Sequence, residues 1–186
     1  MKRTIIASLF LIIACKKEKK EPVTKAEPQK VEIKENTASE NGKDESQAAQ
    51  KWLKENIEAY FKTDLGSMDK AMQKITTQEY YDYKTDAMNV DMDVDGSLTE
   101  KEFQDKWKSK FNTEKAGVGS GFLISAQDWI HVEVSDCELE SSSKNSYLFR
   151  VTLSDDGFKA KYPSQIKVVK EEGKFLIADV LEDHSN

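Results

Sequence analysis

The spacing of apolar residues changes along this chain, and that change constrains the fold more than any other feature. Between residues 46 and 111, apolar side chains recur at intervals of three or four, which places them on one face of a helix. Between residues 129 and 181 they alternate with polar side chains, as in strands that bury one face. Helices followed by a run of strands predict an α+β domain in which N-terminal helices pack on a C-terminal antiparallel sheet.

The helical part divides into three predicted segments. One apolar stripe covers residues 49–61, and a shorter one covers residues 68–75. Thr76 and Glu79 have the spacing of a capping box, which predicts that a third helix begins there. That helix would lead directly into the acidic segment 91–102.

The alternating part contains several short strand patterns separated by turn residues. Residues 122–125 predict a further short strand, and Pro163 predicts an edge strand because proline has no N–H to donate to a neighbour. The main predicted strands are 129–139, 147–153, 166–169 and 175–181, with turns at 141–146, at Asp155-Asp156-Gly157 and at Glu172-Gly173.

The segment from Asp91 to Glu102, D-M-D-V-D-G-S-L-T-E-K-E, places oxygen donors at regular intervals. Carboxylates occupy positions 1, 3, 5 and 12 of the twelve, and the glycine at position 6 permits a sharp turn between them. Ca²⁺ takes six to eight oxygen ligands at about 2.3–2.6 Å, so this donor set suits a calcium ion. The candidate ligands are Asp91, Asp93, Asp95, Ser97 through its backbone carbonyl, Thr99 and Glu102.

This segment resembles an EF-hand calcium loop, and no required position departs from that pattern. The resemblance implies a helix–loop–helix with Ca²⁺ as its cofactor. The alternative is an acidic, solvated loop that matches the pattern by chance. The chain contains no second such loop, and isolated extracellular sites bind with affinities of about 10⁻⁴–10⁻³ M, which favours a structural ion over a switch.

Apolar residues on both sides of the segment support the helix–loop–helix prediction. Tyr83 and Ala87 precede it at helical spacing, and Phe103, Trp107 and Phe111 recur every four residues after it. We interpret the second stripe, Phe103, Trp107 and Phe111, as core packing in preference to a ligand groove.

The N-terminus has the pattern of a targeting segment. A basic start is followed by an apolar run from Thr4 to Ala14 that is too short to span a bilayer. The run ends in Ile12-Ile13-Ala14-Cys15, which resembles the lipobox of a bacterial lipoprotein. The resemblance implies a signal peptide over 1–14 and acyl chains on Cys15 that anchor the protein to a membrane of the cell envelope. The outer membrane or cell surface is favoured over the inner membrane, and an ordinary secretory signal is the alternative.

The next segment, residues 15–45, would join that lipidated cysteine to the rest of the chain. Residues 16–45 contain eight Lys, eight acidic residues and few apolar ones, a composition that predicts a disordered charged tether. Cys137 is the other of the two cysteines, and we interpret it as a packed or half-exposed thiol in preference to a nucleophile.

Residues 46–186 have the length of a single domain. They hold 18 Lys or Arg against 26 Asp or Glu, a net charge of −8, which disfavours a nucleic-acid partner and favours a cation. The closing segment K-V-V-K-E-E-G-K-F-L-I-A-D-V and the order of elements resemble the ketosteroid-isomerase-like cone fold. The resemblance implies helices packed on a curved sheet that leaves a pocket.

Three residues near strand positions are candidates for acid–base catalysis: Asp128, His131 and Asp179. A general base would need a perturbed pKa and a pocket. We prefer to interpret them as a turn residue, a solvent-facing strand residue and a surface carboxylate. If Trp129 and His131 lined an open cavity, the pocket hypothesis would gain support, whereas burial of Trp107 and Trp129 in a filled core would weaken it.

The sequence therefore predicts a lipid-anchored, non-catalytic module that binds Ca²⁺. The first alternative is a pocket domain that binds or transforms a small apolar molecule and carries a structural calcium ion. The second is a protein-interaction lipoprotein whose helix surface contacts an envelope protein partner.

Overall fold

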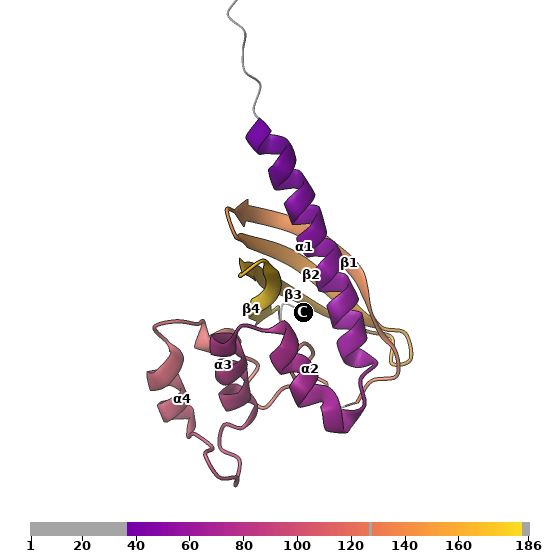
Figure 1. Cartoon of the computed structure of the whole chain (residues 1–186). Coiled ribbons are helices and arrows are strands. Elements are labelled where there is room, and N and C mark those ends of the chain that lie inside the picture. Colours follow the sequence, from indigo (N-terminus) through magenta and orange to yellow (C-terminus); the bar gives the residue numbers. More distant parts are fainter. Residues whose placement is uncertain (1–36, 127, 184–186) are drawn as a thin grey trace, which may run out of the picture. The chain divides into compact units, whose positions relative to one another are not determined.

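The computed structural model describes residues 37–126 and 128–183, which belong to one compact unit. The predicted signal peptide, Cys15 and most of the predicted tether lie outside the described residues. Within this part of the chain, four α-helices precede a four-stranded antiparallel sheet, so the α+β prediction is confirmed (Figure 1). The elements are α1 (Thr37–Phe61), η1 (Leu65–Ser67), α2 (Met68–Ile75), α3 (Gln78–Met88), α4 (Glu100–Trp107), η2 (Thr113–Lys115), β1 (Val132–Ser143), β2 (Ser146–Asp155), β3 (Ala160–Glu171) and β4 (Lys174–Glu182).

The sheet is a meander in which each strand pairs with the next in sequence, in the order β1-β2-β3-β4. The predicted turns at Asp155-Asp156-Gly157 and Glu172-Gly173 join β2 to β3 and β3 to β4, which confirms both hairpins. Alternate residues of the strands enter the core, as the sequence pattern predicts. The buried residues of β2, β3 and β4 include Tyr147, Phe149, Val151, Leu153, Ile166, Val168, Ile177 and Val180.

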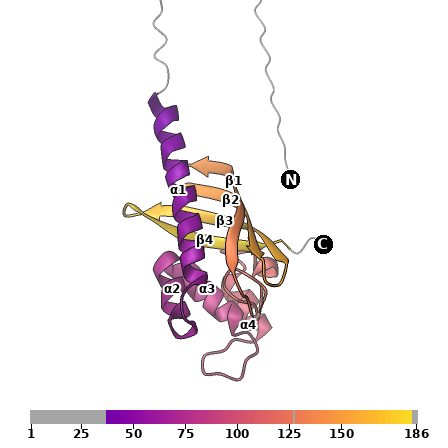
Figure 2. The same ribbon diagram turned by 90° about the vertical axis from the view of Figure 1, so that its right-hand side faces the viewer.

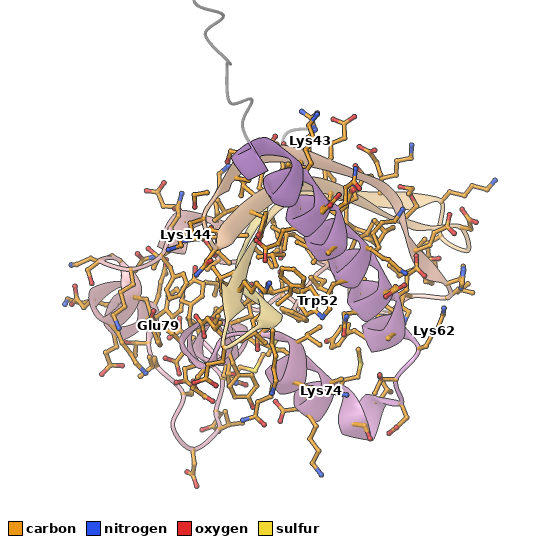
Figure 3. All side chains as sticks on the ribbon, turned by 45° about the horizontal axis from the view of Figure 1, so that its top comes forward. Lys43, Trp52, Lys62, Lys74, Glu79 and Lys144 are labelled. Atoms are coloured by element: carbon orange, nitrogen blue, oxygen red, sulfur yellow. The ribbon has the colours of Figure 1, made fainter. Side chains whose placement is uncertain are left out.

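Helix α1 covers one face of the sheet and is the main source of its apolar cover (Figure 2). Ala49, Leu53 and Ile57 are fully buried, one helical turn apart, and form the stripe predicted from the sequence. Trp52, which is labelled in Figure 3, is half-buried and packs against Phe175 of β4 with ring centroids 6.0 Å apart. No helix among the described residues is long and apolar enough to cross a membrane.

The first helix begins at Thr37, inside the segment predicted as a tether. A contact with the sheet lies at the end of that segment. Glu45 forms an ion pair with Lys170 of β3, and Ser46 is buried. The ordered domain therefore takes in residues that composition alone assigned to a solvated linker.

The segment between α2 and α3 adds to the outer edge of the sheet. Thr76 forms a parallel bridge with Ile177 of β4, and the Thr77 N–H donates to the Ile177 carbonyl at 2.8 Å. The capping box predicted at Thr76 is wrong by one residue: Thr77 is the N-cap of α3, and its hydroxyl accepts from the Tyr80 N–H. Thr76 is instead the C-cap of α2, where its hydroxyl donates to the Met72 carbonyl at 2.8 Å.

Two predicted strand features differ from the structure. Residues 122–125 form no strand, although Phe122, Leu123 and Ile124 are buried. The edge-strand prediction from Pro163 is wrong, because β3 lies between β2 and β4. Pro163 is tolerated because the ladder with β4 begins only at the next residue, Ser164.

The alternation in β1 also breaks down at two points. Ile130 precedes the strand and is 68% exposed, instead of lying on the buried face with Val132 and Val134. A register shift after Val134 then turns Cys137 toward the core.

Candidate metal site

Helices α3 and α4 flank the acidic segment and are joined by aromatic packing. Tyr83 of α3 stacks on Phe111 with ring centroids 4.2 Å apart, and on Phe103 of α4 at 5.5 Å. Trp107 meets Tyr83 edge-on at 5.6 Å. These contacts confirm that Phe103, Trp107 and Phe111 pack against the core.

Polar contacts reinforce the same helix pair. The carboxylate of Asp86 accepts hydrogen bonds from the Trp107 Nε1–H and from the Lys106 ammonium, each at 2.7 Å. Glu79 at the start of α3 forms an ion pair with Lys110 beyond α4. The helices that carry the two ends of the acidic loop are therefore held together without help from a metal ion.

Backbone hydrogen bonds close the base of the loop. The Asp91 N–H donates to the Leu98 carbonyl at 2.9 Å, and the Ser97 hydroxyl donates to the Asn89 carbonyl at 2.5 Å. Gly96 has a φ of +85°, the left-handed conformation that the sequence pattern requires at position 6. Asp91 also has a positive φ, +55°. The chain thus reverses direction between the first and last predicted ligands.

The predicted side-chain ligands fall into two groups. The carboxylates of Asp91, Asp93 and Asp95 are exposed and make no hydrogen bond or ion pair with the rest of the described chain. Glu102 instead accepts hydrogen bonds from Thr99, at 2.9 Å from the N–H and 2.7 Å from the hydroxyl. These bonds complete a capping box at the start of α4 and lower the pKa of Glu102.

The structure therefore joins Thr99 to Glu102 by hydrogen bonds, whereas the three aspartate carboxylates make no hydrogen bond with either residue. In the ranges 37–126 and 128–183, no three His, Cys, Asp or Glu side chains are grouped as a metal ion would require. The donor set nevertheless fits a hard cation, because it consists only of oxygens and the aspartate side chains are free to rotate in solvent. The spacing of Thr99 and Glu102 fits two motifs, a pair of metal ligands and a capping box. The metal-ligand interpretation did not consider the capping box.

The three candidates for acid–base catalysis are not brought together at one site. Asp128 and His131 are exposed, in agreement with their interpretation as a turn residue and a solvent-facing residue. Asp179 differs from the surface carboxylate that was predicted, because one of its oxygens is shielded from solvent and has no hydrogen-bond partner. Burial raises the pKa of Asp179 to about 6.

Asp155 is a buried carboxylate whose role the sequence pattern did not reveal. It is fully shielded from solvent and accepts hydrogen bonds from the backbone N–H groups of Ile130, His131, Gly157 and Phe158. Burial alone would raise its pKa, but the four N–H donors outweigh burial and the pKa of Asp155 is lowered. His131 and Ile130 lie 24 and 25 positions from Asp155 in the sequence, so no local motif could predict these hydrogen bonds.

The environments of Cys137, Trp107 and Trp129 indicate that these residues have structural roles. Burial raises the pKa of the Cys137 thiol to about 11, so the thiol is protonated at neutral pH, as expected for a packed cysteine. Trp107 is buried, and Trp129 is half-buried with its ring edge-on to Phe61 at 5.5 Å.

Comparisons with known proteins identify no relative: no family model, no curated protein and no solved structure matches this chain.

Proposed function

We propose that this protein is a lipid-anchored, non-catalytic module of a bacterial cell envelope that binds Ca²⁺ through the loop Asp91–Glu102. The main support is the pairing of a left-handed Gly96 with three exposed aspartates that have no partner in the described chain. Like charges this close in sequence repel one another, and a divalent cation removes that repulsion. The lipid anchor rests on the sequence around Cys15.

The residues that would hold the ion are those predicted from the sequence: Asp91, Asp93, Asp95, the Ser97 carbonyl, Thr99 and Glu102. Because aromatic packing and the Asp86 contacts already join α3 to α4, the ion would order the loop between two fixed helices. This arrangement supports a structural ion in preference to one that opens the helix pair. The Glu102 carboxylate would serve both α4 and the ion, because a carboxylate has about four acceptor positions.

The calcium site is tested by calorimetric titration of Ca²⁺ into the soluble domain. Glu102→Gln should weaken binding at least about tenfold, because it removes a charged bidentate ligand. Glu100→Gln is the matched control, since Glu100 is equally exposed on the same helix but occupies no ligand position. An unchanged affinity in Glu102→Gln would show that this loop is not the site.

The anchor is tested separately by fractionation of cells that express the full chain. Cys15→Ser should release the protein from membranes and abolish incorporation of labelled fatty acid. Cys137→Ser is the matched control because Cys137 is the only other cysteine of the chain. Equal membrane association in both variants would refute the anchor and leave the calcium hypothesis untouched.

A further inference from the structure

Strand β1 forms one edge of the sheet, and the outer half of that edge is open (Figure 2). Outside its ladder with β2, no backbone group of β1 bonds to another backbone group of residues 37–126 and 128–183. Gln50 of α1 covers the middle of the strand, because its side chain donates to the Cys137 carbonyl. Every residue from Glu138 to Ser143 is exposed. This part of β1 therefore presents backbone groups that another strand could engage.

The opposite edge of the sheet is protected. The Thr77 N–H donates to the Ile177 carbonyl, so the chain between α2 and α3 covers part of β4. Edge strands are commonly protected by lysine or proline, and β1 contains neither. Register shifts after Val134 and Leu139 bend β1, but its pairing with β2 continues to Ser143. The β1 edge thus keeps the geometry that strand pairing needs.

The side chains of β1 that face away from α1 form an acidic row. Glu138 lies opposite Arg150, whose neighbours on β2 are buried on the α1 side, and Asp136 precedes Glu138 by two residues on the same face. Glu140 belongs to the row because its carboxylate lies 3.8 Å from the Arg150 guanidinium. Arg150 pairs with both glutamates, whereas Asp136 has no hydrogen bond or ion pair with another described residue. Three carboxylates therefore share one cation, and the row keeps a net negative charge.

The other face of β1 offers an apolar contact at the same edge. Leu139 lies opposite the buried Phe149, on the α1 side of the sheet, and yet is 41% exposed. A strand added beside β1 would place alternate side chains on the two faces, one set next to Leu139 and the other next to the carboxylates. The edge therefore fits a strand in which apolar and basic residues alternate.

The same charges exclude a second copy of this strand. A second β1 would bring its own carboxylates to the acidic row, and like charges directly opposite each other destabilise strand pairing. Strand β1 has four acidic residues and no basic one, so either direction of pairing would meet this repulsion. The partner must therefore come from a segment of different composition.

We propose that the β1 edge binds an extended segment of another protein in which basic and apolar residues alternate. The segment would add a strand to the sheet, with backbone hydrogen bonds supplying affinity and alternate side chains supplying specificity. Its basic side chains would pair with Asp136 and Glu138, since opposite charges across neighbouring strands stabilise the pairing. This proposal is independent of calcium binding.

The first test is an NMR titration of the full chain, carrying Cys15→Ser, with the blocked heptapeptide K-V-K-V-K-V-K. Binding should shift the amide signals of residues 136–143 and slow the hydrogen exchange of their outward N–H groups. The peptide K-V-K-P-K-V-K has the same charge but lacks a central N–H, so it should bind at least about tenfold more weakly. Equal binding of the two peptides would overturn strand addition, as would no binding of the first.

The second test reverses the charge of the edge. The double variant Asp136→Lys and Glu138→Lys should weaken binding of K-V-K-V-K-V-K at least about tenfold and should instead bind E-V-E-V-E-V-E. The matched control is the double variant Glu171→Lys and Glu172→Lys, which makes the same change of charge at exposed positions of the β3–β4 hairpin. Equal weakening in the two double variants would contradict a site at the β1 edge. If the first double variant fails to fold, the two-peptide comparison on otherwise unchanged protein still decides the proposal.

Discussion

Two aspartate-rich turns of this protein use the same residue type in opposite ways. In the loop after α3, the carboxylates of Asp91, Asp93 and Asp95 are exposed and have no partner in the described chain. In the turn after β2, the Asp155 carboxylate is fully buried and accepts four backbone hydrogen bonds. The first group has its negative charge available to a cation, whereas the charge of Asp155 is already satisfied by the fold.

The difference shows that acidic residues acquire their roles from their surroundings. A buried carboxylate with several N–H donors organises the backbone, and removing it leaves those donors unsatisfied. Exposed carboxylates crowded in one loop contribute little to stability until a cation binds. The two turns should therefore respond differently to substitution and to calcium.

The largest effect is expected from Asp155→Ala. This change leaves four backbone N–H groups without their acceptor, two before β1 and two in the turn after β2. The melting temperature should fall further than for any other variant considered, as followed by circular dichroism. Asp156→Ala is the matched control because Asp156 is the exposed neighbour in the same turn. Equal losses in the two variants would contradict the structural role of Asp155.

A smaller effect, a rise in the melting temperature, is expected when Ca²⁺ is added. At a concentration one hundred times the Kd, binding to the folded state alone stabilises a protein by about 2.7 kcal/mol. The melting temperature should rise accordingly in Ca²⁺ relative to chelator. Asp95→Asn should remove most of this rise, and Asp156→Asn should keep it. The same melt for wild-type protein in Ca²⁺ and in chelator would refute a bound structural ion.

Much of the fold could be predicted because its signals are local. Alternation located β2 and β4, and helical spacing located the buried face of α1, since each pattern depends only on neighbouring residues. The prediction failed where distant contacts decide the structure. The register shift after Val134 and the exposure of Ile130 depend on how β1 meets β2, which no local pattern contains.

The candidate site shows the same limit. The spacing of the acidic loop correctly predicted a sharp turn at Gly96 between two packed helices. It could not distinguish Glu102 as a metal ligand from Glu102 as part of a capping box, because both roles need an acidic residue three positions after Thr99.

The pH dependence of Asp179 is opposite to that of Asp155. Burial raises the folded-state pKa of Asp179 to about 6 from an ordinary value of 3.8, so folding favours its protonated form. Its contribution to stability is complete below pH 3.8 and is lost as the pH rises through about 6. Asp155 has a lowered pKa, so its contribution is present above that ordinary value and is lost on acidification.

Asp179→Asn should therefore raise the free energy of unfolding at pH 7 by about 1–3 kcal/mol, because a neutral side chain avoids the cost of a buried charge. The gain should disappear below about pH 4, where the aspartate is itself protonated. Urea denaturation at a series of pH values measures the gain at neutral pH and its disappearance in acid. A constant difference between variant and wild type across this range would show that ionisation of Asp179 is not the cause.

The smallest effect is expected from Gly96→Ala in the acidic loop. No atom lies within 4 Å of the position that a Cβ would occupy, so any loss comes from the left-handed backbone and not from a clash. That conformation costs a non-glycine residue about 1–2 kcal/mol, which should appear in urea denaturation of the calcium-free protein. Gly66→Ala is the matched control, because its Cβ would make only an ordinary contact at 3.4 Å and its φ is not in the left-handed region. Calcium titration of Gly96→Ala then shows whether the loop changes conformation on binding. If the substitution lowers the free energy of calcium binding as well as the free energy of unfolding, the backbone at Gly96 must change when the ion binds. If it lowers only the free energy of unfolding of the calcium-free protein, the loop already has its ligand-binding conformation.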